Sequence, residues 1–202
     1  MTQKELQIAY CNNKDSFDII KENIENRIIR IENYKGEFYE IYPFSYQRKG
    51  FKQGKPIENI NRIKSTNNLY TYGFNNKNKI IEIREGFELK NEFYYQFLFY
   101  EKDCIKSLSF KNDKTLQNIR FYFFNADGHV LTMYSKGKRG GREEHYQYDK
   151  NKTLISILIK QFDNQGKEQD TLLHSFKYNT DGSLKSIIES SCDNEYSEVI
   201  WK

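Results

Sequence analysis

Residues 176–187 read FKYNTDGSLKSI, and the pattern in this stretch decides the fold. Two earlier stretches share the pattern, YQYDKNKTLISI at 146–157 and YFFNADGHVLTM at 122–133, and weaker copies begin at Phe97 and Tyr72. Each copy has two aromatic residues two positions apart, a turn segment, and two aliphatic residues three positions apart. The first aliphatic residue recurs at steps of 25, 25, 24 and 30 residues, a period that predicts a repeat architecture.

Each part of the pattern has a physical role in a β-hairpin. Aromatic residues two apart lie on the same face of a strand. The Asn or Asp that follows bonds its own backbone, and the Gly three residues later adopts positive φ without a steric clash. Asn78 tolerates that conformation, whereas Lys152 is the awkward copy. The copies therefore predict about five hairpins, with ten antiparallel strands from about 69 to 190, connected by polar joints at 85–91, 111–117, 137–143 and 164–170.

The segments YNTDGSL at 178–184 and YDKNKTL at 148–154 resemble the YD repeat of the RHS family. The resemblance extends over about 120 residues and implies a long, curved β-sheet ribbon. The chain is too short to form the shells with which large RHS proteins surround a toxin. Small cytosolic immunity proteins of bacterial polymorphic-toxin systems, including contact-dependent inhibition systems, have a similar hairpin-repeat style. The resemblance therefore implies a bacterial protein that blocks a toxin by binding it.

The composition is typical of a β-rich protein with an aromatic core. The 202 residues include 15 Phe and 16 Tyr, whereas alanine, the best helix former, occurs only at positions 9 and 126. The 32 basic and 28 acidic residues give a net charge of +4, which neither requires nor excludes a nucleic-acid partner. The cysteines at 11, 104 and 192 lie far apart, which favours reduced thiols. With no apolar run typical of a signal peptide or a membrane span, we expect a cytoplasmic protein.

The first third of the chain precedes the repeats. Apolar residues at helical spacing predict one helix over 16–26, with Asp15 or Ser16 as its cap, followed by a strand over 27–34. Alternation predicts another strand over 38–42, and the segment 43–56 is expected to be a loop. A degenerate further hairpin is expected to begin at Ile60 and Ile63.

The strand expected at 93–100 is apolar on both faces, which means burial on both sides. Its second face needs a cover, and three covers are open: the N-terminal segment, the sheet rolling upon itself, or a bound partner.

Two basic segments are candidate sites for nucleic acid. In the first, over 136–142, cations surround glycines, and the loop either cradles phosphates or is a solvated hairpin joint. In the second, over 48–55, cations alternate with aromatic residues, an arrangement that suits single-stranded nucleic acid, an acidic protein surface or a plain exposed loop. The candidate binding residues of the first segment are Lys136, Lys138, Arg139 and Arg142.

The C-terminal end carries an acidic strip without Lys or Arg between residues 189 and 198. This strip is either a solvated terminus or a surface that meets a basic toxin. Its candidate partner-binding residues are Glu189, Asp193, Glu195 and Glu198. The three histidines occupy different registers, and we find no spacing that predicts a metal site, a cofactor site or a catalytic nucleophile.

Together these patterns predict a mainly β protein: an extended, twisted antiparallel meander of about five hairpin repeats with one N-terminal helix. We expect one domain over 1–202, made of an N-terminal part (1–66), the repeats (67–190) and a C-terminal strand or tail (191–202). The function expected is non-enzymatic: an immunity protein that neutralises a cognate toxin without a cofactor. The alternative is a nucleic-acid-binding protein that uses the loops 48–55 and 136–142.

Overall fold

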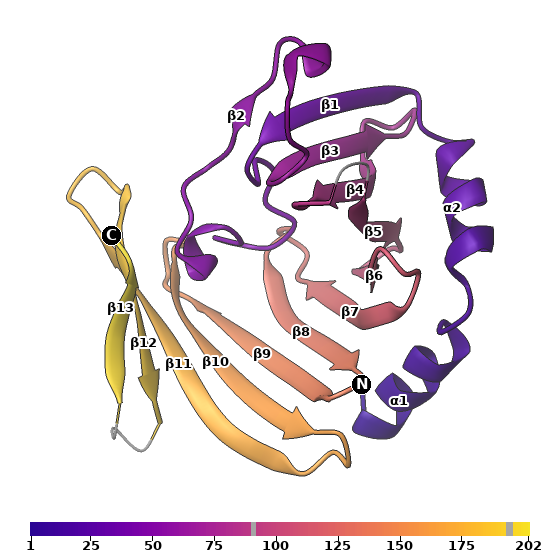
Figure 1. Ribbon diagram of the computed structural model, residues 1–202. Helices are drawn as coiled ribbons and strands as arrows, with labels where there is room; N and C mark the ends of the chain where they lie inside the picture. The colour runs from indigo at the N-terminus through magenta and orange to yellow at the C-terminus, as the bar shows by residue number, and fades with distance from the viewer. Residues whose placement is uncertain (90–91, 193–195) are drawn as a thin grey trace.

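The computed structural model describes residues 1–89, 92–192 and 196–202. Within these ranges, thirteen antiparallel strands form one open sheet, and the strand order follows the chain from β13 back to β3, then β1 and β2 (Figure 1). The helices are α1 (Gln3–Asn12) and α2 (Phe17–Glu25), with short 3-10 helices η1 (Gln47–Lys49) and η2 (Ile60–Arg62). The strands are β1 (Arg30–Lys35), β2 (Lys55–Pro56), β3 (Leu69–Phe74), β4 (Ile80–Gly86), β5 (Phe93–Tyr100), β6 (Cys104–Phe110), β7 (Leu116–Phe124), β8 (Val130–Gly137), β9 (Gly140–Tyr148), β10 (Leu154–Asp163), β11 (Glu168–Tyr178), β12 (Leu184–Ser191) and β13 (Ser197–Trp201).

The prediction of a mainly β, antiparallel fold is confirmed, but the predicted numbers of strands and helices are wrong. The described sheet has more strands than five hairpins contain, because β1, β2 and β13 extend it at its two ends. A helix precedes the expected one: α1 begins with a capping box in which Thr2 and Glu5 bond each other's backbone N–H groups. The expected strand over 38–42 is not a strand, and residues 60–62 form a 3-10 turn instead of starting a hairpin.

The predicted turn chemistry is present, and it recurs more often than the sequence pattern indicates. Six turns within the described meander share one geometry, in which the fourth residue has positive φ and its N–H donates to the C=O of the first. Where the first residue is Asn or Asp, its Oδ1 accepts N–H groups two and four positions on in most turns. The positive-φ residues are Asn78, Lys114, Gly128, Lys152, Gly166 and Gly182. The expected polar joints 111–117 and 164–170 thus contain the same turn as the hairpins themselves.

Lys152 is expected to lower the stability of the protein through its backbone conformation. Its φ of 65° lies in the left-handed region, where a Cβ comes too close to the following carbonyl oxygen. We expect Lys152→Gly to be about 1 kcal/mol more stable than Lys152→Ala, measured by urea unfolding. Both variants remove the exposed ion pair with Asp127, so their difference isolates the backbone. Equal stabilities of the two variants would contradict this explanation.

A β-bulge after each of these turns explains why the two aliphatic residues of the repeat are three positions apart. The strand register shifts by one residue beside the turn, for example between Phe123 and Phe124 on β7. Val130 and Met133 therefore lie in one core cluster although strict alternation would separate them. Bulges also bend strands, which is consistent with the curled sheet in Figure 1.

The second aromatic residue of the repeat ties neighbouring hairpins together. The hydroxyl of Tyr148 donates to the carbonyl oxygen of Val130 at 2.9 Å, and that of Tyr178 donates to Leu154 at 2.7 Å. Each acceptor is the first aliphatic residue of the preceding unit. The repeated tyrosine therefore has a structural role in stacking one unit on the next.

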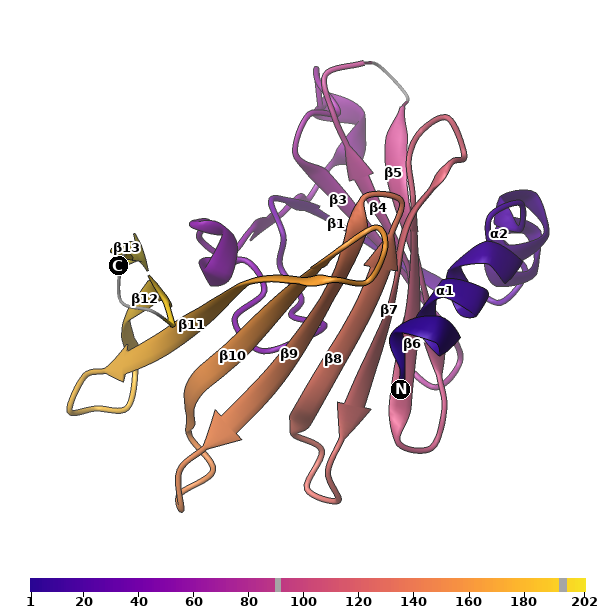
Figure 2. The same cartoon turned by 90° about the horizontal axis from the view of Figure 1, so that it is seen from below.

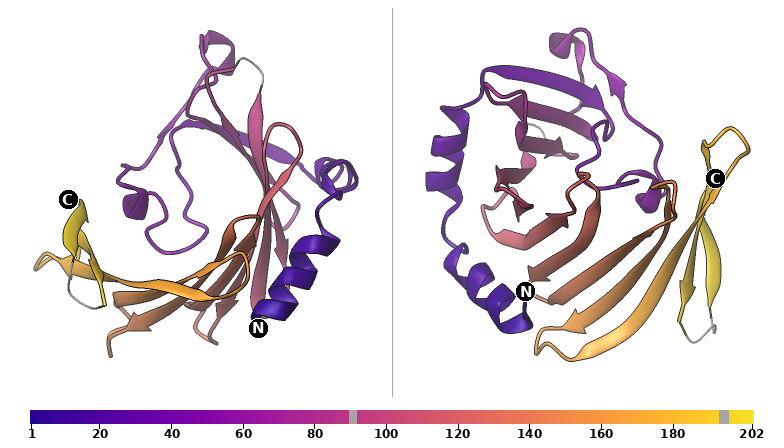
Figure 3. Two further views of the ribbon diagram at one scale, coloured as in Figure 1. Left: turned by 60° about the horizontal axis from the view of Figure 1, so that its bottom comes forward. Right: turned by 180° about the vertical axis from the view of Figure 1, so that it is seen from behind.

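The N-terminal third covers both faces of the sheet. Helices α1 and α2 lie on the outer, convex face, and residues 37–54, here called the inner segment, lie on the concave face (Figures 2 and 3). Tyr10 of α1 and Phe17 of α2 join a core cluster with Phe97 and Leu108 of the sheet. Ile41 and Phe44 of the inner segment pack against the cluster of the opposite face. Of the three covers left open by the sequence, the N-terminal segment is the one found.

Candidate functional site

The inner segment is fixed to the sheet by the guanidinium of Arg48. Its Nη1 and Nη2 donate to the two carboxylate oxygens of Glu144 on β9 at 3.0 and 2.8 Å, a bidentate pair. Its Nε donates to Nδ1 of His174 on β11 at 3.2 Å. Both members of the ion pair are buried, with side-chain exposures of 5% and 4%. Arg142 Nε lies 2.8 Å from the same carboxylate, so one acid is shared by two arginines.

The charges of this cluster shift the pKa values of its members in opposite directions. Burial alone would raise the pKa of Glu144, but the charges of Arg48 and Arg142 outweigh it and lower that pKa to about 2. Burial and the neighbouring Arg48 lower the pKa of His174, against the opposing effect of Glu189. Because Arg48 donates to Nδ1, the proton of neutral His174 sits on Nε2 and is donated to Glu189 at 2.7 Å.

Stability is expected to fall as the pH drops below about 6.5, the ordinary pKa of histidine. The unfolded chain then binds a proton that folded His174 resists, because a proton on Nδ1 would face the Arg48 N–H. Urea unfolding between about pH 8 and about pH 5 measures the slope. His174→Gln should flatten it, whereas His145→Gln, which removes a histidine outside the Arg48 cluster, should keep the contribution of His174. An unaltered slope in His174→Gln would assign the effect to other groups.

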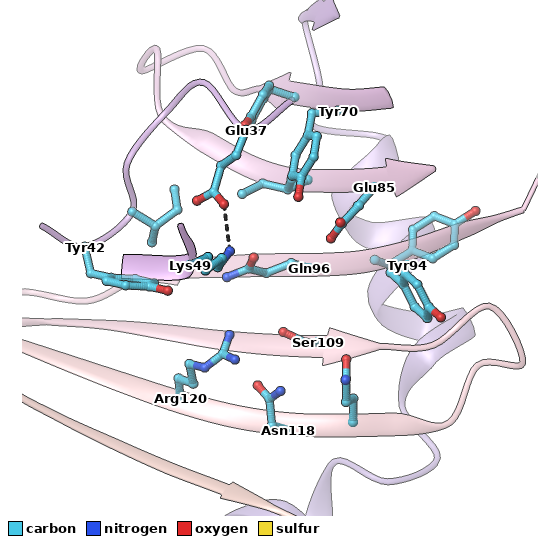
Figure 4. Close-up of a pocket in the computed structure, with 15 residues that line it drawn as sticks. Glu37, Tyr42, Lys49, Tyr70, Glu85, Tyr94, Gln96, Ser109, Asn118 and Arg120 are labelled. Carbon is cyan, nitrogen blue, oxygen red and sulfur yellow. Dashed lines mark hydrogen bonds and ion pairs between the residues drawn. The ribbon is translucent and has the colours of Figure 1, made fainter. Parts of the chain in front are cut away.

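Beside this cluster, a cavity of about 380 Å³ opens between the inner segment and the concave face (Figure 4). Lys49 Nζ donates to Glu37 Oε2 at 2.7 Å at its upper rim, and Ser45 Oγ donates to the other Glu37 oxygen at 2.5 Å. Burial and the nearby Glu85 carboxylate raise the pKa of Tyr70. The polar lining residues are Glu37, Lys49, Tyr70, Glu85, Gln96, Ser109, Gln117, Asn118 and Arg120, among tyrosines 42, 72, 94 and 95.

The structure separates the four basic candidates of the 136–142 segment. Lys138 and Arg139 form the exposed two-residue turn between β8 and β9. Lys136 is buried, and its Nζ donates to the carbonyl oxygen of Asn164 at 3.3 Å. Arg142 turns to the concave face, where it pairs with Glu144. These four cations do not form one loop that could surround a phosphate.

The segment 48–55 is likewise divided. Arg48 and Lys49 are paired with Glu144 and Glu37, while Lys52 and Lys55 are exposed. Because two of the four cations form ion pairs within the molecule, the segment offers less unpaired positive charge than the sequence suggests.

Two of the acidic candidates lie opposite each other on adjacent strands. Glu189 of β12 pairs in register with Glu198 of β13, and Glu198 is exposed. The candidates Asp193 and Glu195 lie outside the described residues.

Sequence reasoning misses the cavity, because its lining comes from several strands and from one irregular segment. In the sequence, Lys49 stands out only as part of a basic run, and Arg120 only as a break in an apolar strand. One signal is present: β6 carries Ser107 and Ser109 at alternate positions, so two small polar residues share one face of a strand.

In the ranges that the structure describes, no helix is long and apolar enough to cross a membrane, and no three His, Cys, Asp or Glu side chains gather into a metal-binding group. No protein-family model matches the chain, and a comparison with curated proteins found no match.

Proposed function

We propose that this chain is a protein-binding module that neutralises a cognate bacterial toxin by direct contact through the open edge of β13. The observation that carries the proposal is that edge: within the described residues, no strand pairs with the outer side of β13. An open edge presents unpaired N–H and C=O groups that an extended segment of another protein can use.

The alternation of hydrogen bonds along β13 identifies the outward groups. Ser191 N–H donates to the carbonyl oxygen of Tyr196 at 3.0 Å, so Ser191 and Tyr196 form a hydrogen-bonded pair. Hydrogen-bonded pairs alternate along an antiparallel ladder, so the next one is Glu189 with Glu198. The N–H and C=O groups of Ser197 and Val199 therefore point away from β12. Val199 also exposes 47% of its surface, which offers apolar contact beside the free backbone groups.

The charge at this edge favours a basic partner. Glu189 and Glu198 lie directly opposite each other, and like charges in that position destabilise a strand pair. A lysine or arginine supplied by an added strand would offset the repulsion and steer association. The same pairing links the edge to the Arg48 cluster, because Glu189 also bonds His174.

The opposite end of the sheet is protected only in part. β2 has two residues, one of them Pro56, and proline has no N–H to offer an added strand. β2 pairs only with Tyr34 and Lys35 of β1, so within the described residues no strand pairs with the outer side of residues 30–32. The acidic pair Glu189–Glu198, and not strand exposure alone, therefore favours β13 as the binding edge.

The test is co-expression with the product of the adjacent gene, scored by cell survival and by one-to-one binding of the purified proteins. Val199→Pro removes an outward N–H that the sheet itself does not use, so it should preserve folding and weaken binding at least about tenfold. Val199→Thr keeps the N–H and serves as the matched control. Full protection by Val199→Pro would exclude the β13 edge as the toxin-binding site. The absence of protection by the unaltered protein would exclude the neighbouring toxin as its target.

Nucleic-acid binding is supported less well, since much of the relevant positive charge is paired or buried. The exposed cations of the two basic segments are Lys49, which pairs with Glu37, and Lys52, Lys55, Lys138 and Arg139. Strong, salt-sensitive retention of the protein on DNA or RNA would reverse this preference.

A further inference from the structure

We propose that the cavity on the concave face binds a small zwitterion of the amino-acid class, with the ligand's carboxylate on Arg120. The Arg120 guanidinium faces the cavity (Figure 4). In the described part of the chain it forms no ion pair, although the more distant charge of Glu144 helps to raise the pKa of Arg120. By contrast, Arg48 and Arg142 on the same sheet face both pair with Glu144. A guanidinium without a counter-ion in a cavity is suited to a carboxylate, which it can bind through two parallel N–H groups.

The space around Arg120 exists because its neighbours are short. Ser107 of β6 and Ser135 of β8 are its cross-strand partners in register. Ser109 likewise lies between Gln96 and Asn118. The volume of about 380 Å³ falls within the ordinary range of small-molecule sites and exceeds what one amino acid occupies.

One buried polar atom that lines the cavity near Arg120 lacks a partner. Among the described residues, Asn118 Oδ1 has no hydrogen-bond partner, and Asn118 belongs to the same strand face as Arg120. Buried polar groups are normally bonded, so an unsatisfied acceptor that lines a cavity indicates a ligand donor. An N–H of the ligand would supply the bond that Asn118 lacks.

The opposite wall of the cavity has the opposite charge. Glu85 and Tyr70 stand across the cavity from Arg120 in Figure 4. Glu85 forms no ion pair in the described ranges, although its charge helps to raise the pKa of Lys49. An ammonium group fits there. A simple anion such as phosphate would meet the charges of Glu85 and Glu37, and a simple cation would meet Arg120 and Lys49, so a molecule with both charges fits best. The tyrosine walls favour an apolar or aromatic side chain.

The experiment uses the full chain, with the twenty L-amino acids as probes. Each amino acid is added separately and binding is screened by thermal shift, then measured by calorimetry. We expect at least one to bind. Removing either its amino group or its carboxylate, by using the deaminated acid or the decarboxylated amine, should weaken binding at least about tenfold on the unaltered protein.

The variants separate this site from unspecific charge effects. Arg120→Gln should weaken amino-acid binding about 10- to 100-fold. Glu85→Gln should weaken binding of the amino acid but leave the affinity for its deaminated acid unchanged. Ser109→Leu should block the cavity with both charges kept, and Lys138→Gln, at an exposed turn, should change nothing. Urea unfolding confirms that each variant is folded. Failure of all twenty amino acids to bind, or equal affinity for inorganic phosphate, would overturn the proposal.

The site and the toxin-binding edge are tested independently. Val199→Pro should leave amino-acid binding intact, and Arg120→Gln should leave the β13 edge intact, so failure of one proposal does not decide the other.

Discussion

Glu144→Gln is expected to lower the free energy of unfolding by about 3–5 kcal/mol, because it removes one partner of a buried ion pair. The carboxylate of Glu144 accepts two hydrogen bonds from Arg48 and one from Tyr146, at 2.6 Å, and pairs with Arg142. Glutamine keeps the shape but leaves the buried Arg48 without a counter-charge.

The matched control is Glu143→Gln, one residue away on the opposite face of β9. Glu143 pairs with His145, whose side chain is 42% exposed, so its loss should cost less than about 1 kcal/mol. Urea unfolding measures both. Because Arg48 holds the inner segment, Glu144→Gln should also speed tryptic cleavage within residues 37–54. Equal effects of the two substitutions would mean that the Arg48 cluster does not anchor the segment.

Phe97→Ala is expected to cost about 3–5 kcal/mol, the second large effect. Phe97 on β5 is fully buried, and its ring centroid lies 6.0 Å from those of Phe17 on α2 and Phe110 on β6. Alanine leaves a cavity where helix, strand and neighbouring strand meet, and the amides of α2 should exchange hydrogen faster as the helix loosens.

The control for this prediction is Phe51→Ala, since that ring is 62% exposed. Its loss should change stability by no more than about 0.5 kcal/mol. If chemical denaturation found similar losses for both variants, burial under α2 would not be the source of the stability.

The sequence predicts the hairpin turns well because their chemistry is local. An Asn or Asp that bonds N–H groups two and four residues on, followed by a positive-φ residue, needs no distant partner. The bulge is also local, but its signature, Val130 followed by Met133, violates the two-residue period, so the pattern alone does not identify it as a bulge. Helix α1 is not among the elements expected from the sequence, although Thr2 and Glu5 have the spacing of a capping box.

The concave face is not predictable in the same way. Arg48 and Glu144 are 96 residues apart, and Arg48 and His174 are 126 apart, so no spacing rule connects them. The inner segment has little regular structure, and its position follows from those contacts and from aromatic packing such as Phe44 on Phe176. Whether a basic residue is free or internally paired depends on such distant contacts, which is why the two basic segments look more available in the sequence than they are.

The strand order has a kinetic consequence. Because each strand from β4 to β13 pairs with the strand just before it, these contacts close short loops, and such topologies fold faster than sheets built from distant pairings. The slow steps are then those that join remote parts of the chain, namely the docking of β1 on β3 and of Arg48 on Glu144. The ribbon can grow by addition of one hairpin at a time, as in other linear arrays, and the inner segment closes over a surface that already exists.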